Sequence, residues 1–136
     1  MKIEFREAVV ADAGLLIEIY NSAFYKDFIR YGECPAYGRS IEDMQRSILE
    51  FPKFVILCDG EPVGCLCVRP EFQGKGIGTS AVAFAKSHYE DWKKFTLITP
   101  VDKEENVRFY TEKCSFKIAA TEMDGNVKVV RFVLEK

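Results

Sequence analysis

The sequence has little of what several classes of protein need. Its 136 residues include one histidine and five cysteines, and these do not recur at the spacing of metal ligands. The longest apolar runs, such as Phe54 to Cys58, have the length of a strand, whereas a membrane-spanning helix needs roughly 20 apolar residues. The charges are balanced, with 19 basic residues against 21 acidic ones and a formal net charge of −2. We therefore expect no metal centre, no membrane span and no general nucleic-acid-binding surface.

The cysteines indicate a reducing compartment. Four of the five lie in or beside apolar runs, where a free thiol behaves as a small hydrophobic side chain. Cys65 and Cys67 are one residue too close to form a CxxC redox pair. The amino terminus, Met1-Lys2-Ile3-Glu4, does not open a signal peptide. We expect buried, reduced thiols in a soluble cytoplasmic protein.

The length and composition predict one domain over residues 1–136, because 48% of the residues are apolar, enough for one sizeable core, and the sequence contains no repeats. The hydrophobic pattern predicts that this domain is of the mixed α/β class. Ser40 and Asp43 resemble a helix-capping box, and Asp59-Gly60 is a strong signal for a tight hairpin. The expected order is strand (3–9), two helices (after Asp12, and 41–49), two strands (54–58 and 62–68), a helix (80–92), a strand (95–99), a short helix (104–113) and two strands (116–121 and 127–134).

The most informative motif is the glycine-rich turn Gln73-Gly74-Lys75-Gly76-Ile77-Gly78-Thr79, which joins a predicted strand to a predicted helix. Glycines allow positive φ angles and a close approach of the backbone, so that successive N–H groups can point at one anion. The helix that follows adds the positive end of its dipole. The motif therefore predicts a phosphate-binding loop.

The loop does not fit every nucleotide-binding pattern equally well. It lacks the lysine that follows the last glycine in the phosphate loop of nucleoside triphosphatases. Gly76-x-Gly78-x-x-Ala81 fits a relaxed dinucleotide fingerprint. That fingerprint also needs an acidic residue at the end of the next strand, which here ends Thr99-Pro100. A dinucleotide-binding enzyme stays an alternative.

The sequence resembles the GNAT family of N-acetyltransferases. The resemblance rests on Gln73-Gly74-Lys75-Gly76-Ile77-Gly78 with its lead-in Val68 to Phe72, and it extends over nearly the whole chain. It includes the segment Asn106 to Phe116, which looks like the tyrosine-bearing helix of the family and the turn after it. Most members have Gly-Phe at that turn, where this chain has Ser115-Phe116. The fold that this implies is GNAT-like, with a mostly antiparallel central sheet flanked by helices.

The resemblance implies acetyl-CoA as the cofactor. The backbone amides of Gly74 to Thr79 would receive the pyrophosphate, and Lys75 and Arg69 would add positive charge. The pantetheine arm would lie along the strand that enters the loop. The implied cofactor-binding residues are Leu66, Cys67, Val68, Gln73, Gly74, Lys75, Gly76, Ile77, Gly78, Thr79 and Asn106. Asn106 can equally be a simple helix N-cap.

The same resemblance points to Tyr110 as the acid that protonates the departing thiolate. A phenol with an ordinary pKa of about 10 carries its proton at neutral pH. The alternative is that Tyr110 is a core aromatic. The sequence does not single out the general base, for which Glu71, Glu33 or a water molecule can serve. The segment that joins the first two helices would form a wall of the acceptor site through Tyr31, Glu33 and Tyr37, unless it is only a packed surface loop.

One feature departs from the family. Three strands precede the cofactor loop in its members, and this sequence offers two, 54–58 and 62–68. Neighbouring strands of a meander alternate in direction, so the loss of one strand would move the loop to the opposite edge of the sheet. We therefore expect that a hairpin of roughly 10 to 15 residues is absent from this sequence near Gly64 and Cys65.

These expectations combine into an N-acetyltransferase that moves an acetyl group from acetyl-CoA to a primary amine, on a small molecule or as an exposed amino group. Transfer would be direct, because no cysteine is placed as an acyl carrier. A non-catalytic acyl-CoA-binding or sensing domain is the main alternative. The terminal strand, Val127 to Leu134, could pair across a homodimer if it is exposed.

Overall fold

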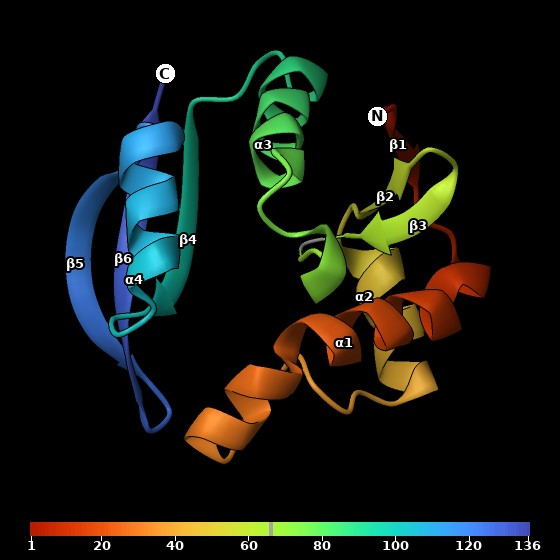
Figure 1. Ribbon diagram of the computed structural model, residues 1–136, viewed down its shortest axis with the longest axis horizontal. Helices are drawn as coiled ribbons and strands as arrows, with labels where there is room; N and C mark the ends of the chain where they lie inside the picture. The colour runs from red at the N-terminus through yellow and green to blue at the C-terminus, as the bar shows by residue number, and fades with distance from the viewer. Residues whose placement is uncertain (66) are drawn as a thin grey trace. The chain divides into compact units, whose positions relative to one another are not determined.

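The computed structural model describes every residue from Met1 to Lys136 except Leu66 (Figure 1). The chain forms two compact units, Met1–Ala81 and Val82–Lys136. Helix α3 (Ile77–His88) contributes residues to both units. Each unit has a sheet of its own.

The first unit is built on a three-stranded antiparallel sheet in the order β1-β2-β3. Its strands are β1 (Ile3–Glu7), β2 (Phe54–Cys58) and β3 (Glu61–Gly64). Between β2 and β3 the chain turns at Asp59 and Gly60, whose φ angles are 50° and 83°. Two consecutive positive φ angles are typical of the two-residue hairpin turn that the Asp-Gly pair predicts. The predicted hairpin is confirmed.

Two helices join β1 to β2. A single 3-10 turn, η1 (Val10–Asp12), leads into α1 (Ala13–Tyr31), and α2 (Ile41–Glu50) follows. The backbone N–H of Asp43 donates to the Ser40 hydroxyl at 3.1 Å, which confirms the predicted cap of α2. Gly32 ends α1 with a φ of 75° and donates its N–H to the Phe28 carbonyl at 2.9 Å.

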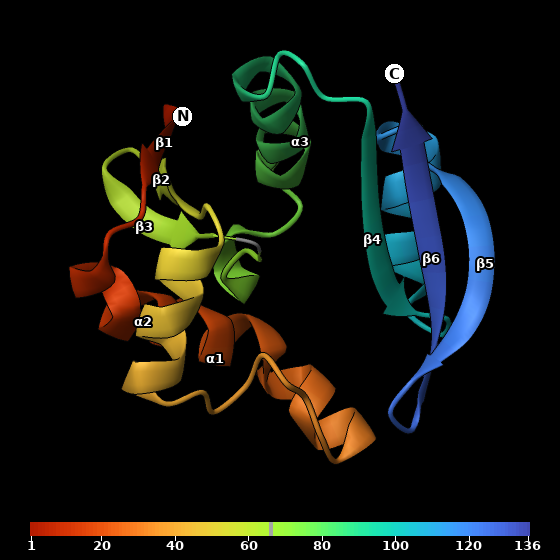
Figure 2. The ribbon, with the colours of Figure 1, turned by 180° about the vertical axis from the view of Figure 1, so that it is seen from behind.

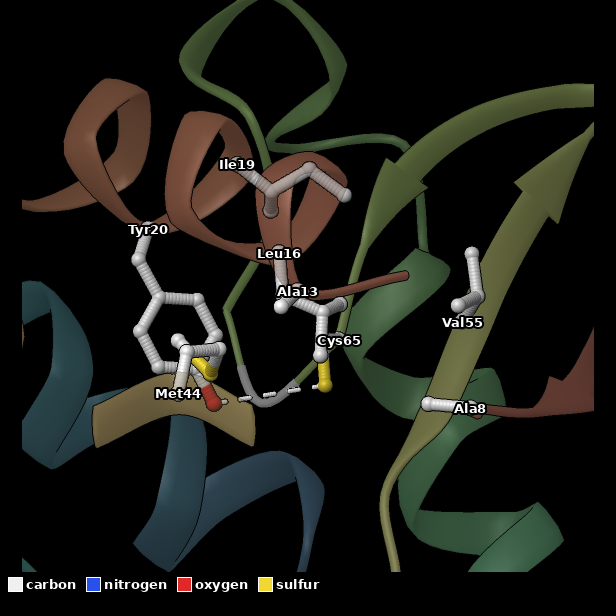
Figure 3. Close-up of a cluster of buried hydrophobic side chains, with 8 residues drawn as sticks. All are labelled: Ala8, Ala13, Leu16, Ile19, Tyr20, Met44, Val55 and Cys65. Carbon is white, nitrogen blue, oxygen red and sulfur yellow. Dashed lines mark hydrogen bonds between the residues drawn. The ribbon is translucent and has the colours of Figure 1, made fainter. Parts of the chain in front are cut away.

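Strand β2 is buried on both faces of its sheet, which explains its unbroken apolar sequence. On one face Val55 belongs to a cluster with residues of α1 and α2, and Figure 3 shows Leu16, Tyr20 and Met44 in this cluster. On the other face Ile56 packs in a cluster with Ile77, the first residue of α3. The start of α3 is thereby anchored on the sheet.

The chain reverses direction directly after β3. Gly64 and Val68 form an antiparallel bridge, the N–H of Cys65 donates to the carbonyl of Cys67 at 2.8 Å, and the N–H of Arg69 donates to the carbonyl of Val63 at 2.8 Å. Leu66 lies outside the described residues. Gly64 makes the reversal possible, because a Cβ on this residue would lie 2.5 Å from the Cys67 carbonyl oxygen.

After this reversal the chain runs in the direction that an additional hairpin was expected to supply. Val68 occupies the place of the third strand as a single bridged residue, antiparallel to Gly64. The chain then enters a 3-10 turn, η2 (Pro70–Phe72), and the glycine loop in the direction that a three-strand meander requires. The structure makes this turn within the given sequence, and the absence of a hairpin near Gly64 and Cys65 stays a prediction. The expectation that 62–68 forms one strand is wrong, because β3 ends at Gly64.

The second unit has a three-stranded antiparallel sheet in the order β4-β6-β5 (Figure 2). Its elements after α3 are β4 (Lys94–Pro100), α4 (Glu104–Arg108), a π-helical turn η3 (Phe109–Lys113), β5 (Lys117–Asp124) and β6 (Val127–Glu135). Both ribbon views show α4 along one face of this sheet (Figures 1 and 2). Phe132 of β6 is the largest fully buried side chain of that face and packs with Val107 and Tyr110.

The expected mixed α/β class with mostly antiparallel strands is confirmed. One placement is wrong. The terminal strand, expected at an edge and free to pair across a dimer, lies in the centre of its sheet between β4 and β5. In the part of the chain that the structure describes, no helix is both long enough and apolar enough to span a bilayer.

The contact at Gly64 predicts a stability effect. We expect Gly64→Ala to lower the free energy of unfolding by about 1 to 3 kcal/mol, the usual cost of overpacking, because the added Cβ meets a backbone oxygen that cannot swing away. Urea denaturation of both proteins measures the change.

Gly14→Ala is the matched control. Gly14 lies in α1, has no atom within 4 Å of the position of a Cβ, and has no positive φ. The substitution should leave stability unchanged or raise it by up to about 1 kcal/mol. Equal stability of the two variants would contradict the proposed role of the Gly64 contact.

Candidate functional site

The glycine loop lies between η2 and α3, and two of its residues have left-handed backbone. Gly74 has a φ of 77° and Gly76 a φ of 83°. A Cβ at either residue would have no atom within 4 Å, so the glycines are required here by backbone conformation and not by protein packing. The side of the loop where side chains would otherwise stand is open to a ligand.

The backbone amides of the loop are available as donors. The N–H of Ser80 donates to the carbonyl of Gly76 at 3.1 Å, which is the bond that starts α3. In the part of the chain that the structure describes, no backbone bond of this kind uses the N–H of Gly74, Lys75, Gly76, Ile77, Gly78 or Thr79. The first N–H groups of a helix have no intrahelical acceptor, and the helix dipole adds partial positive charge beside them. Open amides ahead of a helix, here α3 with 12 residues, are the arrangement on which phosphate-binding sites are commonly built.

Side chains of the lead-in brace the loop. The Gln73 amide nitrogen donates to the Val68 carbonyl at 2.9 Å, which ties the loop to the residue that replaces the third strand. The Lys75 ammonium lies 5.3 Å from the centre of the Phe72 ring, and Lys75 is exposed. Lys75 and Arg69 are the two cations expected to face a phosphate. Lys75 is exposed and therefore accessible to a ligand.

The Arg69 side chain is held by contacts within the protein. Its Nε donates to the Pro62 carbonyl at 3.2 Å, and its Nη2 lies 3.6 Å from Oε1 of Glu18. The side chain is only 16% exposed. Arg69 thus ties the lead-in to β3 and α1.

Three expected cofactor residues precede the loop. Leu66 is outside the described residues. Val68 is half-buried, and its carbonyl accepts from Gln73. Cys67 packs against the buried cluster of α1 and α2, and burial raises the pKa of its thiol to about 12, with Cys65 contributing in the same direction.

Tyr110 lies in the π-helical turn that continues α4. The N–H of Cys114 donates to the Phe109 carbonyl at 3.2 Å, the wide spacing that defines this turn, and the N–H of Phe116 donates to the carbonyl of Tyr110 itself at 2.9 Å. π-helical turns are rare and occur frequently at functional sites. The turn was not expected from the sequence, in which 104–113 shows only a helical pattern.

The Tyr110 ring is held by aromatic neighbours. Its centre lies 5.8 Å from that of Phe116 and 5.5 Å from that of Phe132. Burial raises the pKa of the phenol above its ordinary value, and Cys114 adds a smaller effect in the same direction. The side chain is both a core aromatic and a phenol that keeps its proton at neutral pH, so the two interpretations of Tyr110 are compatible.

Asn106 connects α4 to the end of β4. Its side-chain Nδ2 donates to the hydroxyl of Thr99 at 3.1 Å, and Thr99 is buried. The N-cap of α4 is Lys103, so the interpretation of Asn106 as an N-cap is wrong. No local pattern predicts the Thr99 contact, because it joins two elements across a turn.

The three expected acceptor residues differ in their surroundings. Tyr37 stacks on Phe28 of α1 with ring centres 4.6 Å apart, and Tyr25 lies 6.1 Å from Tyr37. Tyr31 is the last residue of α1 and lies under the Arg30 guanidinium at 5.5 Å. Glu33 is exposed.

The structure thus adds Tyr25 and Phe28 to the expected aromatic segment. The acceptor residues expected from the sequence did not include these two. Their spacing of three residues on a helix was the available signal.

Ser115 adopts left-handed backbone in the turn after Tyr110, with a φ of 64°. This is where the family pattern has glycine, so the turn keeps its geometry with a residue that is strained in it. We expect Ser115→Gly to raise the free energy of unfolding by up to about 1 kcal/mol, measured by urea denaturation.

Ser47→Gly, inside α2, is the control and should lower stability by about 0.5 to 1 kcal/mol, because glycine is a poor helix former. A loss of stability in Ser115→Gly as large as that in Ser47→Gly would show that the turn is not strained.

Comparisons with known proteins point to one family. The model of the acetyltransferase (GNAT) family matches residues 16–116. The uncharacterized protein YrkN of Bacillus subtilis (strain 168) is 33% identical over 79 residues, which are 46% of this chain and 43% of that protein. The chain therefore spans less than half the length of this relative.

Solved structures match over almost the full chain. An acetyltransferase from Thermus thermophilus superposes with a TM-score of 0.77 at 18% identity, covering 100% of this chain and 98% of that one. The aminoglycoside acetyltransferase AAC(6')-Ib, solved in complex with coenzyme A, has a TM-score of 0.75 at 17% identity, covering 99% and 95%. At these identities the two structures show a shared fold.

Proposed function

The chain belongs to the acetyltransferase (GNAT) family, and from this premise we propose that it is an acetyl-CoA-dependent N-acetyltransferase, with residues 1–136 forming one domain of that activity. The acceptor in this proposal is a primary amine, on a small molecule or as an exposed amino group. The five cysteines are all free thiols, which is compatible with a reducing, cytoplasmic location.

The observation that carries the proposal is the glycine loop at the start of α3. Two positive φ angles and a run of amides that no backbone acceptor in the described chain uses suit the pyrophosphate of coenzyme A. The residues present therefore fit this cofactor. Gly74 to Thr79 would hold the pyrophosphate through backbone N–H groups, with Lys75 beside them and Gln73 bracing the loop.

Acetyl-CoA, when bound, supplies the thioester whose acetyl group moves to the amine nitrogen. The transfer forms a C–N bond as a C–S bond and an amine N–H bond break, so the nitrogen gives up a proton and the sulfur that departs needs one. Tyr110 holds a proton at its phenolic oxygen at neutral pH, and burial raises its pKa further. Asn106, anchored on Thr99, fixes the helix that carries Tyr110.

Direct transfer to the amine, without an acyl-cysteine, is supported by the state of the thiols. A thiol attacks as its thiolate, and a raised pKa leaves little thiolate at neutral pH. Cys67, which lies nearest to the loop in sequence, has its pKa raised to about 12 by burial. Cys65 is buried, and the Tyr20 hydroxyl lies 4.0 Å from its sulfur (Figure 3).

The acceptor side of the proposal rests on the aromatic segment after α1. Tyr25, Phe28 and Tyr37 form a half-exposed aromatic group, and Glu33 nearby in sequence adds an exposed carboxylate. An aromatic face and a carboxylate both attract an ammonium group, the form in which an amine arrives at neutral pH. We include Tyr31, Glu33 and Tyr37 as acceptor-binding residues.

Coenzyme A affinity tests the loop. We expect Gly76→Ala to weaken binding of coenzyme A by about 10-fold to 100-fold, the equivalent of one charge-assisted hydrogen bond. The reason is that alanine disfavours the φ of 83° that aims the loop amides. Isothermal titration calorimetry with coenzyme A measures the effect.

Gly60→Ala is the control for strain alone. Gly60 has the same φ of 83° and the same open surroundings, but it lies in the β2–β3 hairpin. It should lose stability like Gly76→Ala and keep its affinity for coenzyme A. A wild-type protein that binds NADH and not coenzyme A would favour the dinucleotide alternative and overturn the proposal.

Turnover tests Tyr110. We expect Tyr110→Phe to lower kcat by about 10²-fold to 10⁴-fold, the usual contribution of a general acid, while the phenylalanine ring keeps the contacts with Phe116 and Phe132. Free-thiol release with a panel of amines measures kcat. Tyr89→Phe, in the same unit, should retain wild-type kcat.

The pH profile gives a second readout. An acid acts while protonated, so the wild-type kcat should fall only as the pH rises through the raised pKa of Tyr110, above the ordinary tyrosine value of about 10. Tyr110→Phe should lack this alkaline limb. Unchanged turnover in the variant would contradict the acid role, and a wild-type protein that binds coenzyme A without acetylating any amine of the panel would favour a sensing domain.

A further inference from the structure

Strand β5 is an exposed sheet edge. In the part of the chain that the structure describes it pairs with β6 alone, and all eight of its residues are exposed. The opposite edge strand, β4, is partly buried along its length. An edge strand presents a row of backbone N–H and C=O groups that can pair with another strand.

The register with β6 shows which β5 side chains share a face. Lys117 and Asp124 lie opposite Val133 and Val127, on one face. The other face carries Ile118, Thr121 and Met123, which lie opposite Phe132, Val130 and Lys128. The register shifts between Ile118 and Ala120, so Ala119 is an extra residue in a β-bulge.

This arrangement is self-complementary. The strand has a lysine at its start and an aspartate at its end, on the same face, and Ile118 and Met123 stand just inside them on the other face. If Ala119, the extra residue of the bulge, is counted together with Ile118 as one position, Thr121 lies at the middle of the strand, with three positions on each side. A strand of this kind can meet a reversed copy of itself with opposite charges and apolar side chains matched.

We propose that β5 is a homodimer interface, in which the β5 strands of two copies pair antiparallel about a two-fold axis at Thr121. In this register Thr121 lies opposite the partner's Thr121, Ile118 opposite the partner's Met123, and Lys117 opposite the partner's Asp124. The two sheets join into one sheet of six strands, three from each copy. A two-fold axis between antiparallel strands passes between a pair of identical residues, here the two Thr121 residues. The bulge at Ala119 then brings the two ends of the strands opposite each other.

The exposed apolar side chains supply the driving force. Ile118 is 57% exposed and Met123 is 62% exposed, and each would be covered by the other across the interface. The symmetry repeats each pair, giving two apolar pairs and two ion pairs of Lys117 with Asp124. An interface of one strand per copy is small, so the dimer dissociates on dilution.

Other registers match less. If the axis passes between the two Ala120 residues, Met123 and Asp124 lie beyond the end of the partner strand. If the axis passes between the two Glu122 residues, Lys117 and Ile118 lie beyond that end. The register centred on Thr121 is the one that uses the whole strand and keeps both apolar residues together.

Charge reversal tests the register. We expect wild-type protein to show a monomer–dimer equilibrium by sedimentation at micromolar to millimolar concentration. Lys117→Asp should raise the dimer Kd about 10-fold, because two exposed ion pairs become two like-charge pairs. Asp124→Lys should do the same, and the double variant should return the Kd to near the wild-type value.

Lys128→Asp is the matched control. Lys128 is exposed on β6, the neighbouring strand, and the substitution makes the same change of charge away from the edge. It should leave the dimer Kd unchanged. A monomer at every concentration, or a dimer that responds equally to Lys117→Asp and Lys128→Asp, would overturn the proposal.

A cross-link tests the symmetry axis. Opposed Cα atoms in an antiparallel pair lie about 4.5 to 5.5 Å apart, within the range of a disulfide. Under mild oxidation Thr121→Cys should give a disulfide-linked dimer through position 121, identified by peptide mass spectrometry. Glu122→Cys, one residue off the axis, should cross-link far more slowly. Equal cross-linking at both positions would show that β5 does not pair about Thr121.

Discussion

The carbonyl oxygen of Cys67 lies where a Cβ on Gly64 would stand, 2.5 Å away, and the direction of the chain at the glycine loop depends on this contact. Because Gly64 has no side chain, the chain folds back on itself within a few residues, and Val68 forms an antiparallel bridge where a full strand would otherwise be needed. The glycine loop then leads into α3, so the backbone amides of the loop lie at the N-terminal end of that helix. Ile77, fully buried against Ile56 and Val63, fixes that helix on the sheet. The direction in which the glycine loop enters α3 is therefore a consequence of close backbone packing upstream of it.

Each unit has a core of its own, and α3 contributes residues to both. Ile77 and Ala81 pack in the core of the first unit, whereas Val82 packs with the aromatic core of the second. The glycine loop of the first unit depends on backbone conformation and on no particular side chain. Tyr110 of the second unit depends on the packing of its ring. Each of these features rests on the core of its own unit.

Features set by neighbouring residues were predictable from the sequence, and those set by distant contacts were not. Asp59-Gly60 and Ser40 act within a few residues, so the hairpin and the helix cap could be predicted. Cys65-Leu66-Cys67 contains none of the usual turn residues, so the reversal was missed and 62–68 was taken as one strand. The central place of β6 depends on pairing with both β4 and β5, information that no local pattern carries. Within the candidate site the glycine loop was recognised, whereas the Thr99 partner of Asn106 and the stacking of Phe28 on Tyr37 depend on tertiary contacts.

Burial has one effect on two kinds of side chain, and this bears on the reaction. It disfavours the anion of a thiol and of a phenol alike, and it raises the pKa of Cys67 and of Tyr110. For a thiol this removes the reactive form, so an acyl-cysteine would form slowly. A phenol of ordinary pKa already carries its proton at neutral pH, so for Tyr110 burial extends the protonated form to higher pH. Both effects are compatible with the proposed direct transfer to the amine and with Tyr110 as the proposed proton donor. The π-helical turn supports this arrangement, since it holds Tyr110 by its backbone as well as by its ring.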